Sequence, residues 1–167
     1  MSSIVPLCAG QETLLAIQKV AYSAWDATYR AIISTDQFDY MFQWMYSLSA
    51  LQDQMEIKQH SFYGGYDAGQ LTGFVSVEWP IIESNFAKVH KLYVDPNLHK
   101  TGLGRQLLQR VFDEAKIRHC TEVRLNVNKN NSAQAFYEKL GFQLLYAEVI
   151  DIGQGYVMDD YVMGIKL

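Results

Sequence analysis

A short basic loop with two glycines holds the residue types best suited to binding an anion. It consists of His99, Lys100, Thr101, Gly102, Leu103, Gly104 and Arg105. Glycine lets the backbone approach a ligand closely and adopt dihedral angles that other residues avoid. If a helix begins in this loop, its first N–H groups lack partners within the helix and favour a negative group, and Lys100 and Arg105 add positive charge. The loop therefore predicts a cradle for a pyrophosphate group.

The segments on either side of this loop are predicted to be a strand and a helix. Residues Phe86–Val94 alternate and are rich in β-forming side chains, and the run ends near Pro96. Apolar residues then recur at helical spacing, which predicts an amphipathic helix over Gly104–His119. Its apolar face consists of Leu103, Leu107, Leu108, Val111, Phe112 and Ala115. A strand that leads through a glycine loop into a helix aims the N–H groups of the loop at one ligand.

A second segment that could do chemistry lies downstream, at Asn130–Phe142. Its first two residues are asparagines, which offer caps for a short helix over Ser132–Leu140. Gly141 follows this helix and favours a left-handed C-cap. The helix carries Tyr137, whose phenol has an ordinary pKa of about 10 and is protonated at neutral pH. This side chain could donate a proton to a leaving group.

The rest of the chain must position these two segments. The pattern predicts a β-like start at Ile4–Leu7, helices from Gln11 to about Trp25 and over about Gln37–Leu51, a hairpin of Ser61–Asp67 and Leu71–Trp79, a strand at Glu122–Asn128, and closing strands at Gln143–Ile152 and Asp160–Leu167. This order of elements predicts an α/β (α+β) fold, a mixed sheet with helices packed on it. We expect residues 1–167 to form a single domain.

Composition narrows the class of protein. A formal net charge of −4 argues against nucleic acid as the main ligand. No apolar run approaches the ~18 residues of a membrane span, and the first residues lack the pattern of a signal peptide. Cys8 and Cys120 show no metal-ligand spacing, so we expect free thiols in the cytoplasm. Four scattered histidines give no reason to predict a metal site, and the sequence leaves a homodimer open.

Both segments carry a family likeness. The loop His99–Gly104 resembles motif A of the GCN5-related N-acetyltransferases, Gln/Arg-x-x-Gly-x-Gly/Ala, with His99 in place of the usual Gln or Arg. Asn130–Phe142 resembles the family's motif B, Asn-x-x-Ala-x-x-Phe/Leu-Tyr-x-Lys-x-Gly-Phe. A narrower likeness, to the PaiA-type polyamine acetyltransferases, rests on the aromatic second helix, on Leu92-Tyr93-Val94 and on the tail segment 155–163.

The resemblance implies a particular fold and a co-substrate. The sheet would be mostly antiparallel, with a central parallel pair, Phe86–Val94 and Glu122–Asn128, splayed around acetyl-CoA, and with helices on both faces. Backbone groups of Leu92 and Val94 would hold the pantetheine arm, and Tyr137 would be the acid towards the departing sulfur. The residues implied in cofactor binding are Leu92, Tyr93, Val94, His99, Lys100, Thr101, Gly102, Leu103, Gly104, Arg105, Asn130, Ala133 and Phe136.

The general base stays open at this point. Many family members have a Glu on the strand before the glycine loop, where this chain has Lys88. His90 lies two residues further, on the same face of a regular strand, and has an ordinary pKa of about 6.5. Glu83 or Glu78, acting through water, is an equal rival, and the reaction could also proceed without a single base. We list Tyr137 and His90 as candidate catalytic residues.

The resemblance and the composition together predict an acetyl-CoA-dependent N-acetyltransferase that acts on a small, polyamine-like amine by direct attack in a ternary complex. Acidic residues that could face such a cation are Glu78, Glu83, Asp159 and Asp160. One alternative is an enzyme that acetylates a protein N-terminus or lysine. Another is a binding module that senses acyl-CoA without turnover, which Lys88 favours and Tyr137 disfavours.

Overall fold

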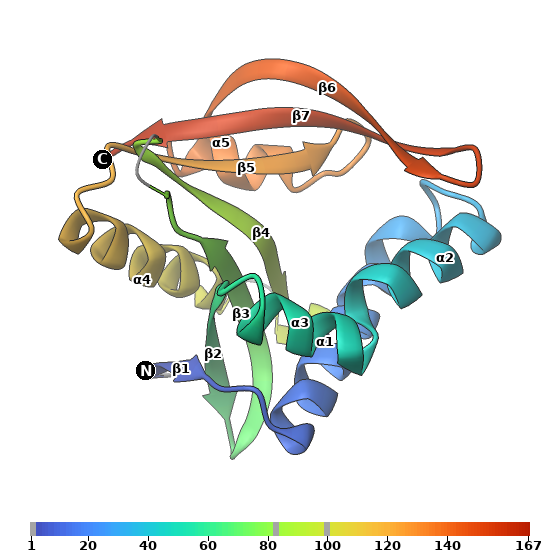
Figure 1. Ribbon diagram of the computed structural model, residues 1–167, viewed down its shortest axis with the longest axis horizontal. Helices are drawn as coiled ribbons and strands as arrows, with labels where there is room; N and C mark the ends of the chain where they lie inside the picture. The colour runs from blue at the N-terminus through green and yellow to red at the C-terminus, as the bar shows by residue number, and fades with distance from the viewer. Residues whose placement is uncertain (1–2, 82–83, 99–100) are drawn as a thin grey trace.

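The computed structural model describes residues 3–81, 84–98 and 101–167. Its strands form a seven-stranded sheet in the order β1-β2-β3-β4-β5-β7-β6 (Figure 1). The strands are β1 (Ile4–Leu7), β2 (Ser61–Asp67), β3 (Gln70–Glu78), β4 (Phe86–Val94), β5 (Glu122–Asn128), β6 (Gln143–Gly153) and β7 (Tyr156–Lys166). The helices are α1 (Gln11–Tyr29), α2 (Thr35–Tyr46), α3 (Leu48–Glu56), α4 (Leu103–Ile117) and α5 (Gln134–Lys139), and a 3-10 helix, η1 (Pro96–Leu98), follows β4.

The central feature of the sheet is the pair β4 and β5, which run parallel, whereas the other neighbouring strands run antiparallel. Their pairing starts at Phe86↔Glu122 and ends at Val89↔Leu125. Beyond that point β4 stays paired with β3 and β5 stays paired with β7, so the sheet opens between them, as Figure 1 shows. The mixed sheet with a splayed parallel pair and flanking helices is confirmed.

A β-bulge at His90 lies where the two strands separate. On β3, Ser76 and Val77 are consecutive, but their partners on β4 are Lys91 and Val89, so His90 is an extra residue. A bulge bends its strand and increases the local twist. It also shifts the alternation by one residue, so the simple count that put His90 on the face of Lys88 does not hold across it.

The bulge distributes β4 between two cores. Before the bulge, Ala87 and Val89 are buried in the core under α4 and α5. After it, Leu92 packs against that same core, whereas Tyr93 packs into the core formed by α1, α2 and α3. If β4 kept all its residues but had no bulge, Tyr93 would share a face with Val89. Helices therefore cover both faces of the sheet.

One predicted helix is wrong as a single element. The segment Gln37–Leu51 is broken at Ser47, whose backbone is extended (ψ 152°) and whose hydroxyl accepts a hydrogen bond from the N–H of Ala50 at 3.3 Å. Serine competes for the backbone in this way and so starts a new helix. The closing strand also begins earlier than predicted, at Tyr156, because β6 and β7 form a long hairpin.

The bulge leads to a first prediction. Deleting His90 would make Val77↔Val89 and Ser76↔Lys91 consecutive pairs of a regular ladder and would keep Leu92, Tyr93 and Val94 on their present faces of β4. We therefore expect the deletion variant to keep cooperative denaturant unfolding, because no side chain would face the wrong core. His90→Ala keeps the chain length and should cost about 1 kcal/mol or less. A deletion variant that unfolds without cooperativity would contradict this account of the bulge.

Candidate active site

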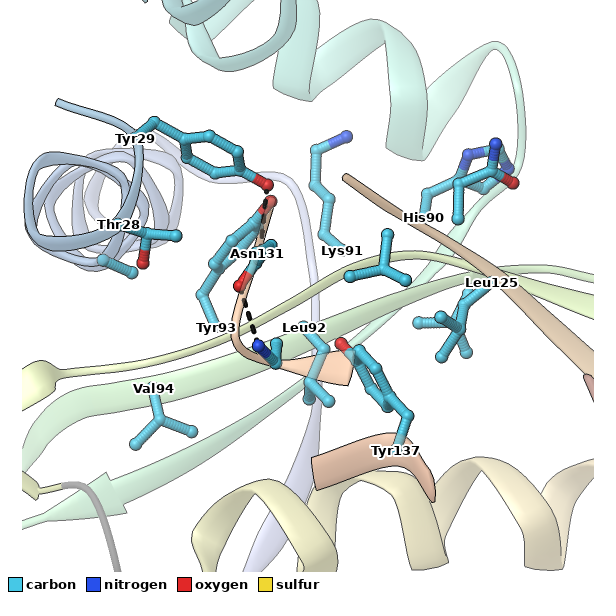
Figure 2. A pocket seen from close by; sticks show the side chains of 15 residues that line it. Thr28, Tyr29, His90, Lys91, Leu92, Tyr93, Val94, Leu125, Asn131 and Tyr137 are labelled. Atoms are coloured by element: carbon cyan, nitrogen blue, oxygen red, sulfur yellow. Dashed lines mark hydrogen bonds between the residues drawn. The ribbon is translucent and has the colours of Figure 1, made fainter. Parts of the chain in front are cut away.

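The opening between β4 and β5 contains a cavity of about 150 Å³ (Figure 2). Its walls come from α1, from both strands and from the segment that begins α5. Residues that line it are Ala24, Thr28, Tyr29, Val89, His90, Lys91, Leu92, Tyr93, Val94, Leu125, Asn126, Val127, Asn131, Ala133 and Tyr137. The predicted residues Leu92, Tyr93, Val94, Ala133, Tyr137 and His90 are thus brought together here.

Tyr137 stands on the floor of this cavity. Its side chain is 8% exposed and its hydroxyl points towards the space between the strands, as Figure 2 shows. The ring is held by edge contacts with Phe136 and Phe142, at centroid distances of 5.3 and 5.7 Å. Burial raises the pKa of Tyr137 well above its usual value. The hydroxyl therefore keeps its proton at neutral pH and can donate it.

Asn131 occupies the position in the cavity where Asn130 was expected. The Asn131 carboxamide oxygen accepts the N–H of Ala133 at 2.9 Å, and its nitrogen donates to the hydroxyl of Tyr29 at 3.4 Å. Asn130 is exposed, and its N–H donates to the side chain of Asn128 at 2.9 Å. The role of Asn130 in cofactor binding stays a prediction. Sequence reasoning missed Asn131, although an asparagine beside the motif asparagine was a signal.

The glycine loop leads directly into α4. Gly102 is the N-cap residue and has a left-handed φ of 85°, which favours glycine. At Gly104 an added Cβ would lie 3.4 Å from the ring of Phe136, so this glycine lets α4 pack closely against α5. Leu103 is buried in the core, which leaves only its backbone for a ligand. Thr101 and Arg105 are exposed at the helix start.

Some predicted residues cannot be placed. His99, Lys100 and Glu83 lie outside the described residues. Phe136 packs beside Tyr137 and is 36% exposed, next to Gly104 but not among the residues that line the cavity. The described part of the loop nevertheless lies close to the end of the cavity, because a Cβ at Gly104 would be 3.8 Å from the side chain of Val94.

A second cavity, of about 100 Å³, adjoins the first and shares Tyr29, His90, Tyr93 and Asn126 with it. Its remaining walls are Trp25, Ile33, Gln37, Met41, Met45, Tyr46, Asn128, Val157, Met158 and Asp160. Aromatic and thioether side chains thus surround a single carboxylate, that of Asp160. Such walls suit the methylene chain and the charged nitrogen of an organic cation.

The polar groups of this second cavity are only partly satisfied by the protein. Asp160 is 6% exposed; burial raises the pKa of its carboxyl, and Asn126 opposes that rise. The Asn126 nitrogen donates to Glu148 at 3.0 Å, whereas its buried oxygen has no partner among the described residues. Of the predicted acidic residues, Asp159 instead pairs with Lys129, so it does not face this cavity.

His90 and Glu78 form a close pair at the edge of the two cavities. His90 Nε2 lies 2.7 Å from Glu78 Oε2, and the His90 ring stacks on that of His60 at 4.5 Å with an angle of 10°. Burial lowers the pKa of His90 to about 4, against the opposing effect of Glu78. Burial also lowers the pKa of His60. Both rings are therefore neutral at pH 7.

The structure brings together three ligand-type side chains that are scattered in the sequence. The donor atoms of His60, Glu78 and His90 lie within 4.8 Å of one another. A ring-nitrogen lone pair lies in the plane of its ring, so two nearly parallel rings cannot both direct a lone pair at one ion without turning. The arrangement suits proton transfer between His90 and Glu78 better than it suits a metal ion.

Comparison with known proteins identifies the family. The sequence model of the acetyltransferase (GNAT) family matches residues 20–142, which span the opened strand pair, the glycine loop and the Tyr137 segment. The chain belongs to this family. It is therefore an acetyltransferase, and the family resemblance of the two motifs is confirmed.

Two similar proteins narrow the likeness. Spermidine N(1)-acetyltransferase from Thermoplasma acidophilum is 28% identical over 138 residues, which cover 80% of this chain and 84% of that protein. The crystal structure of the PaiA N-acetyltransferase from Thermoplasma acidophilum, in complex with coenzyme A, matches with a TM-score of 0.83 and 26% identity, over 100% of this chain and 99% of that one. The likeness to the PaiA-like subgroup is confirmed.

A third similar protein is named for a protein acceptor rather than a small amine. The ribosomal protein bS18-alanine N-acetyltransferase from Salmonella typhimurium is 40% identical over 57 residues, which cover 34% of this chain and 38% of that protein. This match spans about a third of either chain.

No helix in the described ranges combines the length and apolarity of a membrane span.

The glycine loop generates the second prediction. Gly102→Val forces a β-branched residue into a left-handed conformation at the start of α4, which should distort the N–H groups that face an anion. We expect the Kd for acetyl-CoA, measured by calorimetry, to rise about tenfold or more, equivalent to about 1.4 kcal/mol.

A matched control separates binding from strain. Gly69, in the β2–β3 turn, has a similar φ of 79° and open space around a Cβ, so Gly69→Val carries a comparable backbone strain outside the loop. This control should lose stability but keep the affinity. Unchanged affinity in a folded Gly102→Val protein would refute the role of the loop.

Proposed function

We propose that this enzyme transfers the acetyl group of acetyl-CoA to a primary amine of a small, polyamine-like molecule, by direct attack in a ternary complex. The observation that carries the proposal is the opening between β4 and β5, with Tyr137 on one side and a cavity lined by Asp160 on the other. Two substrates can meet there without a covalent enzyme intermediate.

The residues around the opening fit coenzyme A. Past Val89, the edge of β4 that faces β5 has no strand partner, so backbone groups near Leu92 and Val94 are free to bind the amide groups of a pantetheine arm. The N–H groups at the start of α4, with Thr101 and Arg105, would hold the pyrophosphate. Bound there, acetyl-CoA supplies an activated acetyl group as a thioester.

Tyr137 is proposed as the acid. Its hydroxyl would donate a proton to the sulfur when the carbon–sulfur bond breaks, because a free thiolate is a poorer leaving group than a thiol. The aromatic contacts of its ring hold this hydroxyl in one direction. The second cavity would hold the amine so that its nitrogen approaches from the side of the sheet covered by α1 and α2.

Asp160 is proposed to select the acceptor. A polyamine has a second ammonium group, which could pair with the Asp160 carboxylate while the first nitrogen reacts. Burial raises the pKa of Asp160 and so disfavours its charged carboxylate form. A cation bound beside it would lower that pKa again and favour the carboxylate. The spermidine acetyltransferase among the similar proteins supports this choice of acceptor.

His90 is proposed to pass a proton towards solvent. Glu78 accepts from Nε2 of the neutral ring, which leaves Nδ1 to accept a proton from the cavity. Glu78 is about half exposed, so it can exchange that proton with water.

The alternative of a protein acceptor is supported by the bS18-alanine N-acetyltransferase match. It is opposed by the second cavity, whose walls come from α1, α2, β4, β5 and β7 and which suits a small molecule better than a peptide chain. A sensor without turnover has no use for a hydroxyl donor between the strands, so Tyr137 opposes that alternative.

The third prediction concerns Tyr137. Tyr137→Phe keeps the ring and removes the proton donor, so we expect kcat to fall by roughly 10²–10⁴-fold with little change in cofactor affinity. Tyr63→Phe is the matched control, since Tyr63 is also buried in the same core. Thiol release should be measured where chemistry limits the rate. An unaltered kcat in a folded Tyr137→Phe protein would exclude the role.

The fourth prediction concerns the acceptor. We expect kcat/KM for spermidine to exceed that for a matched monoalkylamine by roughly ten- to hundredfold, because a hydrogen bond to a charged group contributes about 1.5–3 kcal/mol. Asp160→Asn should remove most of this preference, whereas Asp159→Asn, at a residue paired with Lys129, should keep it. Equal values for the two amines, or a higher value for a lysine peptide, would overturn the polyamine proposal.

A further inference from the structure

Lys91 is a buried amine without a counter-charge. Lys91 is 7% exposed, and its side-chain nitrogen forms no ion pair with the residues that the structure describes. The nitrogen lies 5.2 Å above the centre of the Tyr46 ring. Burying a charge away from water is unfavourable unless it is paired, and a buried group therefore tends to become neutral. Neither the fold nor the proposed mechanism so far accounts for this side chain.

The bulge determines which side of the sheet Lys91 occupies. Lys91 is the first residue after the extra residue of β4, and its pairing partner on β3 is Ser76. Figure 2 shows its side chain rising from β4 beside Tyr29, away from the side where Tyr137 stands. Lys91 also lines the first cavity. The amine and the phenol therefore approach the opening from opposite sides.

The groups that face Lys91 favour its neutral form. Burial, together with the positive charge of Lys58, lowers the pKa of Lys91 to about 7. The other titratable groups around it are His90 and Tyr93 on β4, His60 before β2, Tyr29 on α1 and Tyr46 on α2. Both histidines are neutral at pH 7, and the carboxylate of the adjoining cavity, Asp160, forms no ion pair with Lys91.

We propose that Lys91 Nζ is the general base that takes a proton from the ammonium group of the acceptor. This inference rests on the proposed acetyl transfer and deepens it. A primary amine is mostly protonated near neutral pH, with a pKa of about 10.4 by analogy with lysine, so it must lose a proton before it can attack. A base works best when its pKa lies near the operating pH.

The proton transfers balance over one turnover. The acceptor ammonium gives one proton to Lys91 Nζ, and the neutral nitrogen attacks the thioester carbonyl. As the carbon–sulfur bond breaks, the sulfur takes the proton of Tyr137, and the second proton lost by the nitrogen returns to the Tyr137 oxygen. One proton remains on Lys91, and the pair His90 and Glu78 passes it to water.

The test is the pH dependence of kcat for spermidine acetylation in three variants. Lys91→Met keeps the volume and removes the base, so kcat should fall by roughly 10²–10⁴-fold and the rise of kcat through about pH 7 should vanish. Lys58→Met removes a nearby positive charge, so the pKa of Lys91 should rise. The rise of kcat with pH should then move to higher pH, and the maximal kcat should stay the same. Lys116→Met, at an exposed position in the last turn of α4, should leave the profile unchanged.

The outcomes separate this inference from the proposed function. A wild-type protein without amine-dependent thiol release would overturn the acetyl-transfer proposal. If the wild type is active and the Lys91→Met variant keeps both the wild-type kcat and the rise of kcat through about pH 7, only the role of Lys91 is overturned. The role of Lys91 is also overturned if Lys91→Met loses activity but Lys58→Met does not shift the pH profile of kcat. A lysine with a purely structural role would give that result. Thermal unfolding of each variant confirms that the proteins compared are folded.

Discussion

The structure depends on the point where two parallel strands stop pairing. β4 and β5 are hydrogen-bonded only as far as Val89 and Leu125, and a single extra residue, His90, turns β4 away there. A gap in the middle of a sheet exposes backbone groups that would otherwise be paired, which is unfavourable unless something fills it. α1 closes one side of the gap and α5 the other, and a substrate of extended shape can complete the hydrogen bonding.

The same bulge separates the chemistry into two faces. Tyr137 belongs to the core under α4 and α5, whereas Lys91 and Tyr93 belong to the aromatic core of α1 and α2. The proposed acid and the proposed base thus stand on opposite sides of the opening. Burial shifts the pKa of each in the direction that the proposed chemistry requires, because it keeps the phenol protonated and increases the neutral fraction of the amine.

Local patterns predicted much of this fold. Glu122–Asn128 and the hairpin around Gly69 follow the alternation of their side chains, and the glycine loop before α4 is evident from its spacing. The break at Ser47 was missed because the run of aromatics before it was taken as part of one continuous helix, which concealed a capping serine. The bulge, the stacking of His60 on His90 and the burial of Lys91 depend on register between distant strands, which no local pattern contains. The motif pointed to Asn130, but it is Asn131 that lines the cavity. This difference also depends on how distant segments pack, so the motif alone could not predict it.

The central claim is that acetyl-CoA and an amine meet in this opening and react directly. Initial rates of thiol release, measured with acetyl-CoA and spermidine varied together, test it most directly. Direct attack in a ternary complex predicts double-reciprocal lines that intersect, with no thiol burst when the amine is absent. Parallel lines together with an amine-independent burst would indicate an acetylated enzyme and contradict the account, and so would thiol release that no amine accelerates.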